Sequence, residues 1–216
     1  MPRLTTVLRA LGPVIAWPRP AEVIAGAAGA GVALSICAAV ILWSGASPTG
    51  GLLIAPMGAT AVILFALPNS PLAQPWSAVV GNTASAAMAT AVHQVADYPA
   101  VVIGAAALLS LAAMFVLRAL HPPGGAVALT AALNPAMLDA GGLRFVLGPA
   151  LIDTAALVVI AILWHRLNGR VYPFRHPQAE VPHAPAVTRC AARSGSGPRW
   201  QRSGATGPPV FCAHPR

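Results

Sequence analysis

Charged residues are scarce in this chain, and lysine is absent. Among 216 residues only 8% are charged and 56% are hydrophobic, whereas a soluble globular domain carries about 25% charged residues. Between Val23 and Leu117 the only side chain expected to be ionised at neutral pH is Asp97, with His93 as a further titratable group. The composition therefore excludes an ordinary soluble domain and predicts a membrane protein surrounded by lipid bilayer.

The chain also lacks a cysteine framework and a nucleic-acid-binding motif. Its three cysteines, Cys37, Cys190 and Cys212, show neither metal-ligand spacing nor the pattern of a disulfide scaffold. The net charge of +8 comes from arginines that cluster beside hydrophobic segments, and such clusters are typical of the cytoplasmic flanks of membrane spans. We therefore expect no metal, no cofactor and no nucleic-acid partner.

Six hydrophobic segments cover most of the chain, at roughly 21–43, 50–67, 77–96, 99–118, 122–135 and 144–166. A bilayer core of about 30 Å needs about 20 apolar residues in a helix. The first, fourth and sixth segments reach that length, the second and third are marginal, and the fifth is too short. The pattern predicts an all-α polytopic membrane protein with four to six hydrophobic helices, two of them short or re-entrant. Four and six crossings both remain open.

The segments divide the chain into three parts. Residues 1–20 form a basic N-terminus, residues 21–171 form the transmembrane domain, and residues 172–216 form a tail rich in Pro, Gly, Ser and Arg. The tail has no apolar periodicity, so we expect it to be disordered. Because basic residues favour the cytoplasmic side, we expect both termini there, with Arg144 alone on the unfavoured side.

Two stretches of similar sequence suggest an internal repeat. The stretch APMGATAVILFALP (55–68) and the stretch HPPGGAVALTAALN (121–134) share four of fourteen positions. Each follows a long hydrophobic segment and precedes another, so the segments group as three plus three. Because each group contains an odd number of segments, the second would be inverted relative to the first, as in many secondary transporters. Chance similarity in an alanine-rich chain is the alternative.

Each stretch begins with residues that suit the start of a short helix. Proline in the first turn loses no hydrogen bond, and glycine permits a close approach of the backbone to a ligand. Unpaired amides at a helix N-terminus carry partial positive charge and bind anions. The predicted substrate-binding residues are Pro56, Gly58, Asn82, Arg118, His121, Pro122, Pro123, Gly124 and Gly125.

Two further ionisable residues are candidates for a proton or counter-ion site. Asp153 lies well inside an apolar segment, where a carboxylate is costly unless it is protonated or paired. His93 shares one face of a helical pattern with Asn82 and Ser85. A purely structural ion pair and helix–helix hydrogen bonds are the alternatives, and Arg118 has the alternative of ending a span at the interface. The candidate partners of Asp153 are Arg118, Arg144, His121 and His93.

The motifs RALHPPGGA (118–126) and APMGATAVILFALPNSPLAQPW (55–76), together with Gly81-Asn82, resemble the HPP family of integral membrane proteins. The resemblance covers roughly residues 15–172. Members of that family are described as four-pass, and its plastid and cyanobacterial members are associated with nitrite transport. The resemblance therefore implies a small-anion transporter, without saying which motif residues contact the anion.

We expect a transporter of a small inorganic anion, with nitrite the leading candidate, in a bacterial cytoplasmic membrane. A pathway made of two short repeats also suggests a homo-oligomer. One alternative is a membrane-embedded enzyme that uses His93, His121 and Asp153 in acid–base or metal chemistry, although the sequence shows no metalloprotease motif or nucleophile elbow. The other is a sensor or scaffold subunit without turnover. Of these, we expect the transporter and no enzymatic activity.

Overall fold

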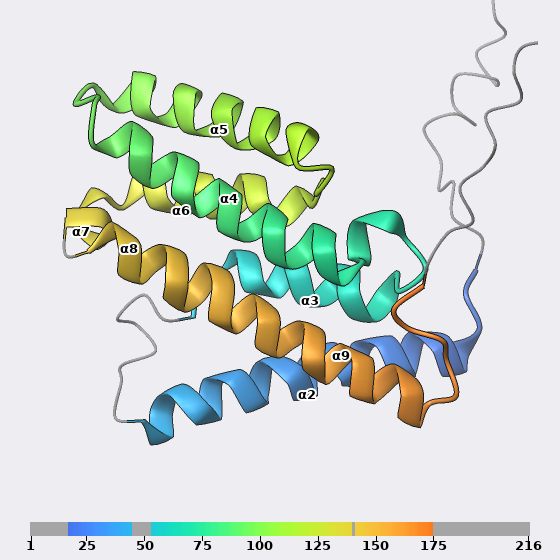
Figure 1. Ribbon diagram of the computed structural model, residues 1–216. Coiled ribbons are helices and arrows are strands. Elements are labelled where there is room, and N and C mark those ends of the chain that lie inside the picture. Colours follow the sequence, from blue (N-terminus) through green and yellow to red (C-terminus); the bar gives the residue numbers. More distant parts are fainter. Residues whose placement is uncertain (1–16, 45–52, 140, 175–216) are drawn as a thin grey trace, which may run out of the picture. The chain divides into compact units, whose positions relative to one another are not determined.

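The computed structural model of the chain describes residues 17–44, 53–139 and 141–174 (Figure 1). Throughout those residues the regular elements are helical, η2 being a single 3₁₀ turn and η3 a π-helical stretch, so the expected all-α membrane architecture is confirmed. The elements are α2 (Pro20–Trp43), α3 (Pro56–Ala66), η2 (Pro71–Ala73), α4 (Pro75–His93), α5 (Pro99–Val116), α6 (Pro122–Leu133), α7 (Pro135–Asp139), α8 (Gly142–Phe145), η3 (Val146–Asp153) and α9 (Thr154–Leu167).

Proline marks the start of most of these helices. It is the first residue of α2, α3, η2, α4, α5, α6 and α7. At this position the missing N–H would be unpaired in any case, and the fixed φ angle of proline is already helical. Prolines thus divide a nearly uniform apolar chain into separate helices. The predicted hydrophobic segments correspond to α2, α3, α4, α5, α6 and the continuous run from α8 to α9.

Three helices are long and apolar enough to cross a membrane: α2, α5 and the continuous Gly142–Leu167. α2 is flanked by Trp17, which is 99% exposed, and ends at Trp43, which is 92% exposed, as expected for aromatic residues at the two membrane interfaces. α3 and α6 contain 11 and 12 residues, fewer than the roughly 20 that a full crossing needs. The fifth segment is therefore short, as predicted. Of the two segments predicted to be marginal, the second is short and the third forms the 19-residue α4.

α4 lies at the centre of the bundle and contacts α5, α6, η3 and α9. Its buried positions are mostly small, which allows neighbouring backbones to approach closely where lipid supplies no hydrophobic driving force. They also include three polar side chains, so the interior of the bundle is not purely apolar. The buried residues of α4 are Ser77, Ala78, Gly81, Asn82, Ser85, Ala86, Ala89 and Val92.

The two short helices, α3 and α6, run in opposite directions (Figure 1). Their N-terminal parts lie side by side, because Thr60 in α3 is hydrogen-bonded to His121, the residue that precedes α6. An inverted 3+3 repeat requires this opposite orientation of its equivalent helices. The two stretches that look alike in the sequence therefore meet inside the bundle.

The last span is distorted in its first half. η3 contains Pro149, which lacks an N–H and whose ring would clash with a carbonyl of the preceding turn in a regular α-helix. The wider π-helical geometry accommodates that clash. Regular α-helix resumes at Thr154, directly after Asp153. The distortion therefore sets the positions of two polar residues within this span.

The described part of the chain extends slightly beyond the expected end of the transmembrane domain. Tyr172 is 1% exposed, and its hydroxyl donates to the Ala73 carbonyl at 2.6 Å. The backbone N–H of Phe174 donates to Gln74 Oε1 at 2.8 Å. These contacts attach residues 172–174 to the start of α4. The predictions made for residues 1–16 and 175–216 lie outside the described residues.

Candidate functional site

Four fully buried polar side chains form one hydrogen-bonded cluster where α3, α4, α6 and α9 meet. They are Thr60, Asn82, His121 and Thr154, each 0% exposed. Asn82 Nδ2 donates to Thr60 Oγ1 and to Thr154 Oγ1, both at 3.0 Å. His121 Nε2 lies 3.2 Å from Thr60 Oγ1. We refer to these four residues as the buried polar cluster.

The hydrogen bonds place a proton on Nδ1 of the His121 ring. Nδ1 lies 2.8 Å from the Leu72 carbonyl, and a carbonyl only accepts, so Nδ1 carries a proton and donates. In the neutral ring, Nε2 then accepts from the Thr60 hydroxyl, whose oxygen accepts from Asn82. The Thr154 hydroxyl donates to Met57 Sδ at 3.5 Å. The cluster is thus consistent with a neutral imidazole.

Two buried oxygen atoms on α4 have no hydrogen-bond partner: Asn82 Oδ1 and Ser85 Oγ. Both residues are 0% exposed and lie one turn apart on the same helix. Leaving a buried polar atom unpaired costs about 1–3 kcal/mol, so such atoms are uncommon in native interiors. The cluster therefore has hydrogen-bonding capacity that the described residues do not use.

The residues around His121 are packed closely against α4 through glycines. A Cβ added at Gly81 would lie 2.6 Å from the Ala119 carbonyl oxygen and 2.8 Å from His121 Cβ. A Cβ added at Gly124 would lie 2.7 Å from Ser85 Oγ and 3.1 Å from the Gly81 carbonyl oxygen. The shortest separation at each position is below 3.0 Å, which real Cβ contacts essentially never show, so a larger residue at either position would displace its neighbours. This close approach holds the start of α6 against the polar face of α4.

The residues predicted to bind substrate at the starts of α3 and α6 differ in burial and in hydrogen bonding. Pro56, Pro123 and Gly124 are buried, Gly58 and Gly125 are half-buried, and Pro122 is exposed. The Gly58 and Gly124 amides donate to the carbonyls of Ala55 and His121 at 3.0 and 2.8 Å, so neither amide is a free donor. Side chains, rather than these helix ends, supply the polar groups of the site.

Arg118 lies outside the buried polar cluster. Its side chain is exposed, and its φ of 53° is in the left-handed region. The Arg118 N–H donates to Phe115 O at 3.1 Å, and the Ala119 N–H donates to Met114 O at 2.8 Å. This pair of bonds is the Schellman cap, in which the left-handed position is usually glycine. Arg118 therefore ends α5 by its backbone conformation.

The predicted proton or counter-ion residues do not meet each other. His93 Nε2 lies 2.8 Å from Asp139 Oδ1, and the Asp139 side chain is 69% exposed. Asp153 is half-buried, and its Oδ2 has no hydrogen-bond partner. Over the described residues, Asp153 forms no ion pair with any of its four candidate partners, since the ion pair found there is His93–Asp139. Asp153 is adjacent in sequence to Thr154, a member of the cluster.

Sequence reasoning missed Thr60 and Thr154, which connect the cluster. Both are hydroxyl residues in otherwise apolar helices, and Thr60 lies within the first of the two similar stretches. These were the available signals, but a threonine in an apolar helix is usually satisfied by its own backbone, as Thr83 and Thr90 are. In the part of the chain that the structure covers, no three His, Cys, Asp or Glu side chains are grouped closely enough to hold a metal ion.

Comparison with known proteins identifies the family. Two transmembrane proteins of Dictyostelium discoideum are 32% and 29% identical to the chain over 126 residues, which is 56% of this chain and 44% and 40% of the relatives. The chain thus spans less than half the length of these relatives. No solved structure matches it significantly. The model of the HPP transmembrane region matches residues 16–173, which include the buried polar cluster. The chain is therefore an integral membrane protein that belongs to the HPP family.

Proposed function

We propose that this protein transports a small inorganic anion across the membrane, with nitrite the leading candidate, and that it is not an enzyme. The observation that supports the proposal is the buried polar cluster. Polar side chains inside a membrane bundle are costly and commonly mark the path of a substrate or ion. Here three of them come from α3, α4 and α9 and the fourth, His121, directly precedes α6; α3 and α6 are too short to span the bilayer. Such short helices are common at transporter binding sites.

The chemistry of the cluster favours an anion over a cation. Its side chains are two hydroxyls, one amide and one imidazole, and it contains no carboxylate. Each of these groups has a hydrogen-bond donor. In the described arrangement these donors bond within the protein, so binding of an oxyanion requires some of them to turn away from their present partners. A second proton on His121 would add a positive charge at Nε2, which would then donate instead of accepting. A buried cation would lack the neutralising carboxylate that low-dielectric surroundings demand.

Asp153 has the position of a proton carrier in this proposal. It precedes Thr154, a member of the cluster, and its Oδ2 is buried without a partner. A carboxylate in such surroundings is stabilised when it takes up a proton. We propose that Asp153 exchanges a proton as the anion passes. His93 is paired with Asp139 at the end of α4 and is not adjacent in sequence to a member of the cluster.

The charge distribution supports cytoplasmic termini. Arg19 precedes α2, and Arg166 and Arg170 lie at the end of α9; both places border the same cavity. The opposite ends of the helices carry Asp97 and Asp139. By the preference for basic residues on the cytoplasmic side, we propose a cytoplasmic membrane location with both described ends facing the cytoplasm. We also propose a homo-oligomer, because two short repeats in one chain are too small to shield a pathway across the membrane from lipid.

The decisive test is uptake into vesicles that contain the purified full chain. Nitrite, nitrate, formate and chloride should be compared with and without a proton gradient, and nitrite uptake is expected to exceed that of empty vesicles. Asn82→Leu should abolish uptake, because Asn82 links Thr60 and Thr154. The matched control is Asn134→Leu, since Asn134 is exposed and bonds only within its own helix at Thr130 O. Asp153→Asn should make uptake insensitive to the proton gradient.

The outcomes separate the proposal from its alternatives. Well-folded protein that gives no flux for any of the four anions would indicate a non-transporting subunit. Normal uptake in the Asn82→Leu variant would show that the buried polar cluster is not part of the transport pathway, even if transport itself is confirmed. Equal losses in Asn82→Leu and Asn134→Leu would point to general damage to the fold.

A further inference from the structure

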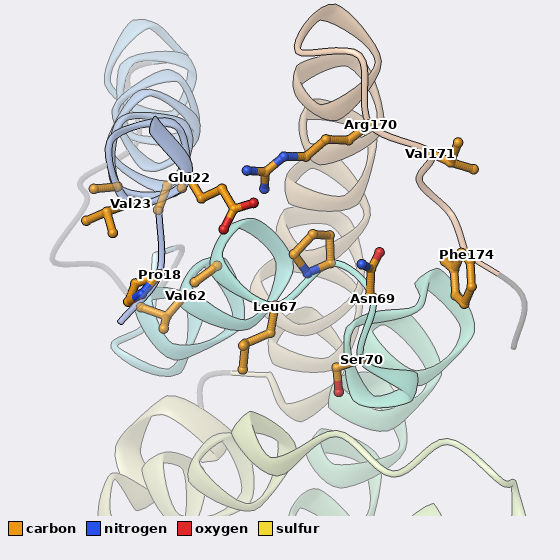
Figure 2. Close-up of a pocket in the computed structure, with 15 residues that line it drawn as sticks. Pro18, Glu22, Val23, Val62, Leu67, Asn69, Ser70, Arg170, Val171 and Phe174 are labelled. Atoms are coloured by element: carbon orange, nitrogen blue, oxygen red, sulfur yellow. The ribbon is translucent and has the colours of Figure 1, made fainter. Parts of the chain in front are cut away.

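A cavity of about 900 Å³ lies between the first half of α2, the end of α3 and residues 170–174 (Figure 2). It is lined near its rim by Pro18 and Glu22, at the start of one span, and by Arg170, which follows the end of another span at Leu167. Trp17, next to Pro18, is 99% exposed and fits the level of lipid headgroups. The cavity therefore lies at a membrane interface, and no residue of the buried polar cluster lines it.

The lining of the cavity has a polar part and an apolar part. The polar part contains Glu22 and Arg170, whose carboxylate and guanidinium point into the same space in Figure 2. Among the residues that the structure describes, these two form no ion pair within 4.0 Å with each other or with another side chain. The apolar part includes Val23, Ala27 and Ala30, which follow one face of α2 away from the charges. The cavity is thus amphipathic along the direction of the span.

The two opposite charges complement a zwitterion with an apolar chain. We propose that this cavity binds a phosphatidylethanolamine-type phospholipid, with the phosphate on Arg170, the ammonium on Glu22 and one acyl chain along the small residues of α2. A guanidinium matches phosphate geometry with two parallel hydrogen bonds, and a primary ammonium donates to a carboxylate. The volume is in the range of about 300–1,000 Å³ seen for small-molecule sites, so it accommodates the headgroup and the first part of one chain.

Other phospholipids fit this pair of charges less well. An anionic headgroup such as phosphatidylglycerol would contact Arg170 but would place its only charge near the carboxylate of Glu22. A phosphatidylcholine headgroup is zwitterionic, but its quaternary ammonium has no N–H to donate to that carboxylate. The order of binding expected from the structure is therefore phosphatidylethanolamine first, with the other two weaker.

The test is lipid retention by the full-length protein, delipidated in detergent and measured by native mass spectrometry. Phosphatidylethanolamine, phosphatidylcholine and phosphatidylglycerol should be added separately at equal concentration. Arg170→Gln is expected to lower retention of phosphatidylethanolamine roughly tenfold, the usual scale for loss of one charge-assisted contact. Glu22→Gln should instead shift the preference from phosphatidylethanolamine towards phosphatidylglycerol, because Arg170 then acts alone.

Two matched controls isolate the cavity from general effects of charge and bulk. Arg166→Gln removes an exposed arginine one turn earlier that does not line the cavity, and it should leave retention unchanged. Ala27→Phe, which fills the apolar part, should reduce retention, whereas Ala28→Phe on the exposed neighbouring position should not. The proposal is overturned if the wild-type protein retains the three lipids equally, as expected if another segment of the chain covers the cavity. It is also overturned if Arg166→Gln and Arg170→Gln behave alike.

Discussion

The starts of α3 and α6 look similar in sequence, but they are built differently. At the start of α6, His121 is fully buried, its ring bonds to Leu72 O and to Thr60, and Gly124 is pressed against α4. At the start of α3, Gly58 faces open space, since a Cβ there would meet no atom within 4 Å. The polar residue of α3 comes one turn later, at Thr60. At Gly124 the start of α6 is therefore pressed against α4, whereas Gly58 in α3 has no such contact.

In the proposed transporter, this difference gives separate roles to the two halves of the apparent repeat. α6 contributes the one titratable ring of the cluster and is anchored to α4, which carries Asn82. α3 contributes a hydroxyl that can turn between partners. An anion site that must bind and release its substrate needs both a fixed element and adaptable donors, because binding that is too rigid or too tight slows release. The predictions below test this division of roles.

The largest effect is expected for removal of the His121 ring. His121→Ala leaves the Leu72 carbonyl and the Thr60 hydroxyl without a partner and opens a cavity, so it should cost about 3 kcal/mol of folding stability and abolish uptake. His121→Asn keeps a donor near the Leu72 carbonyl but loses the link to Thr60. It should recover most of the stability and little of the uptake, as measured by thermal unfolding in detergent and by vesicle uptake per folded protein.

Thr60→Val provides the corresponding change on the α3 side. It keeps the shape of the side chain and removes two hydrogen bonds, at a cost of about 1–2 kcal/mol. Thr130→Val in α6 is the matched control, because the Thr130 hydroxyl bonds only to the Ala126 carbonyl of its own helix. A division of roles requires Thr60→Val to reduce uptake and Thr130→Val to leave it intact. Full uptake in Thr60→Val would mean that α3 provides only packing.

Glycine substitutions should distinguish the close contact between α4 and the start of α6 from the open glycine positions of α3 and α6 by stability. Gly81→Ala and Gly124→Ala force contacts of 2.6 and 2.7 Å, and overpacking of this kind costs about 1–3 kcal/mol. Gly58→Ala and Gly125→Ala meet no atom within 4 Å and should be neutral or stabilising by up to about 1 kcal/mol, because alanine is the better helix former. Equal losses in all four variants, measured by thermal unfolding, would contradict the packing difference.

The smallest effect is expected for Arg118→Gly. Arg118 adopts a left-handed conformation with a φ of 53°, which costs a non-glycine residue roughly 1–2 kcal/mol. Glycine should therefore raise the unfolding temperature slightly. Gly169, which has a φ of 69° in the equivalent cap after α9, is the reference: Gly169→Ala should lower it. A loss of uptake in a stabilised Arg118→Gly protein would show that the arginine side chain takes part in transport.

The helices were predictable because the sequence features that specify them lie within each helix. Apolar runs and the prolines that begin them specify each helix within its own sequence, so the six segments and the two short helices agree with the structure. The end of α5 was harder to predict, because its left-handed cap is occupied by Arg118 where glycine would be the usual signal. Tyr172 was assigned to the tail, since one aromatic residue in a Pro-rich segment does not reveal that its hydroxyl reaches Ala73.

The composition of the polar site was only partly predictable. His121 and Asn82 were identified from the motif, but their common partner Thr60 was not. Arg118 and His93 were included because charged and titratable groups are conspicuous in an apolar sequence. In the structure, Arg118 forms a helix end and His93 pairs with Asp139 near the surface. The rarity of charged and titratable residues thus did not indicate which residues belong to the buried polar cluster.

By itself, the sequence determined that the protein lies in a membrane, roughly where its hydrophobic helices lie and that the fifth of them is short. Only the tertiary structure decided which polar residues meet: Thr60 and His121 are 61 positions apart, and Asn82 and Thr154 are 72 apart. The physical reason is the solvent. In water a helix shows its inward face by its apolar residues, but in lipid both faces are apolar, so periodicity does not reveal which hydroxyls and amides face one another.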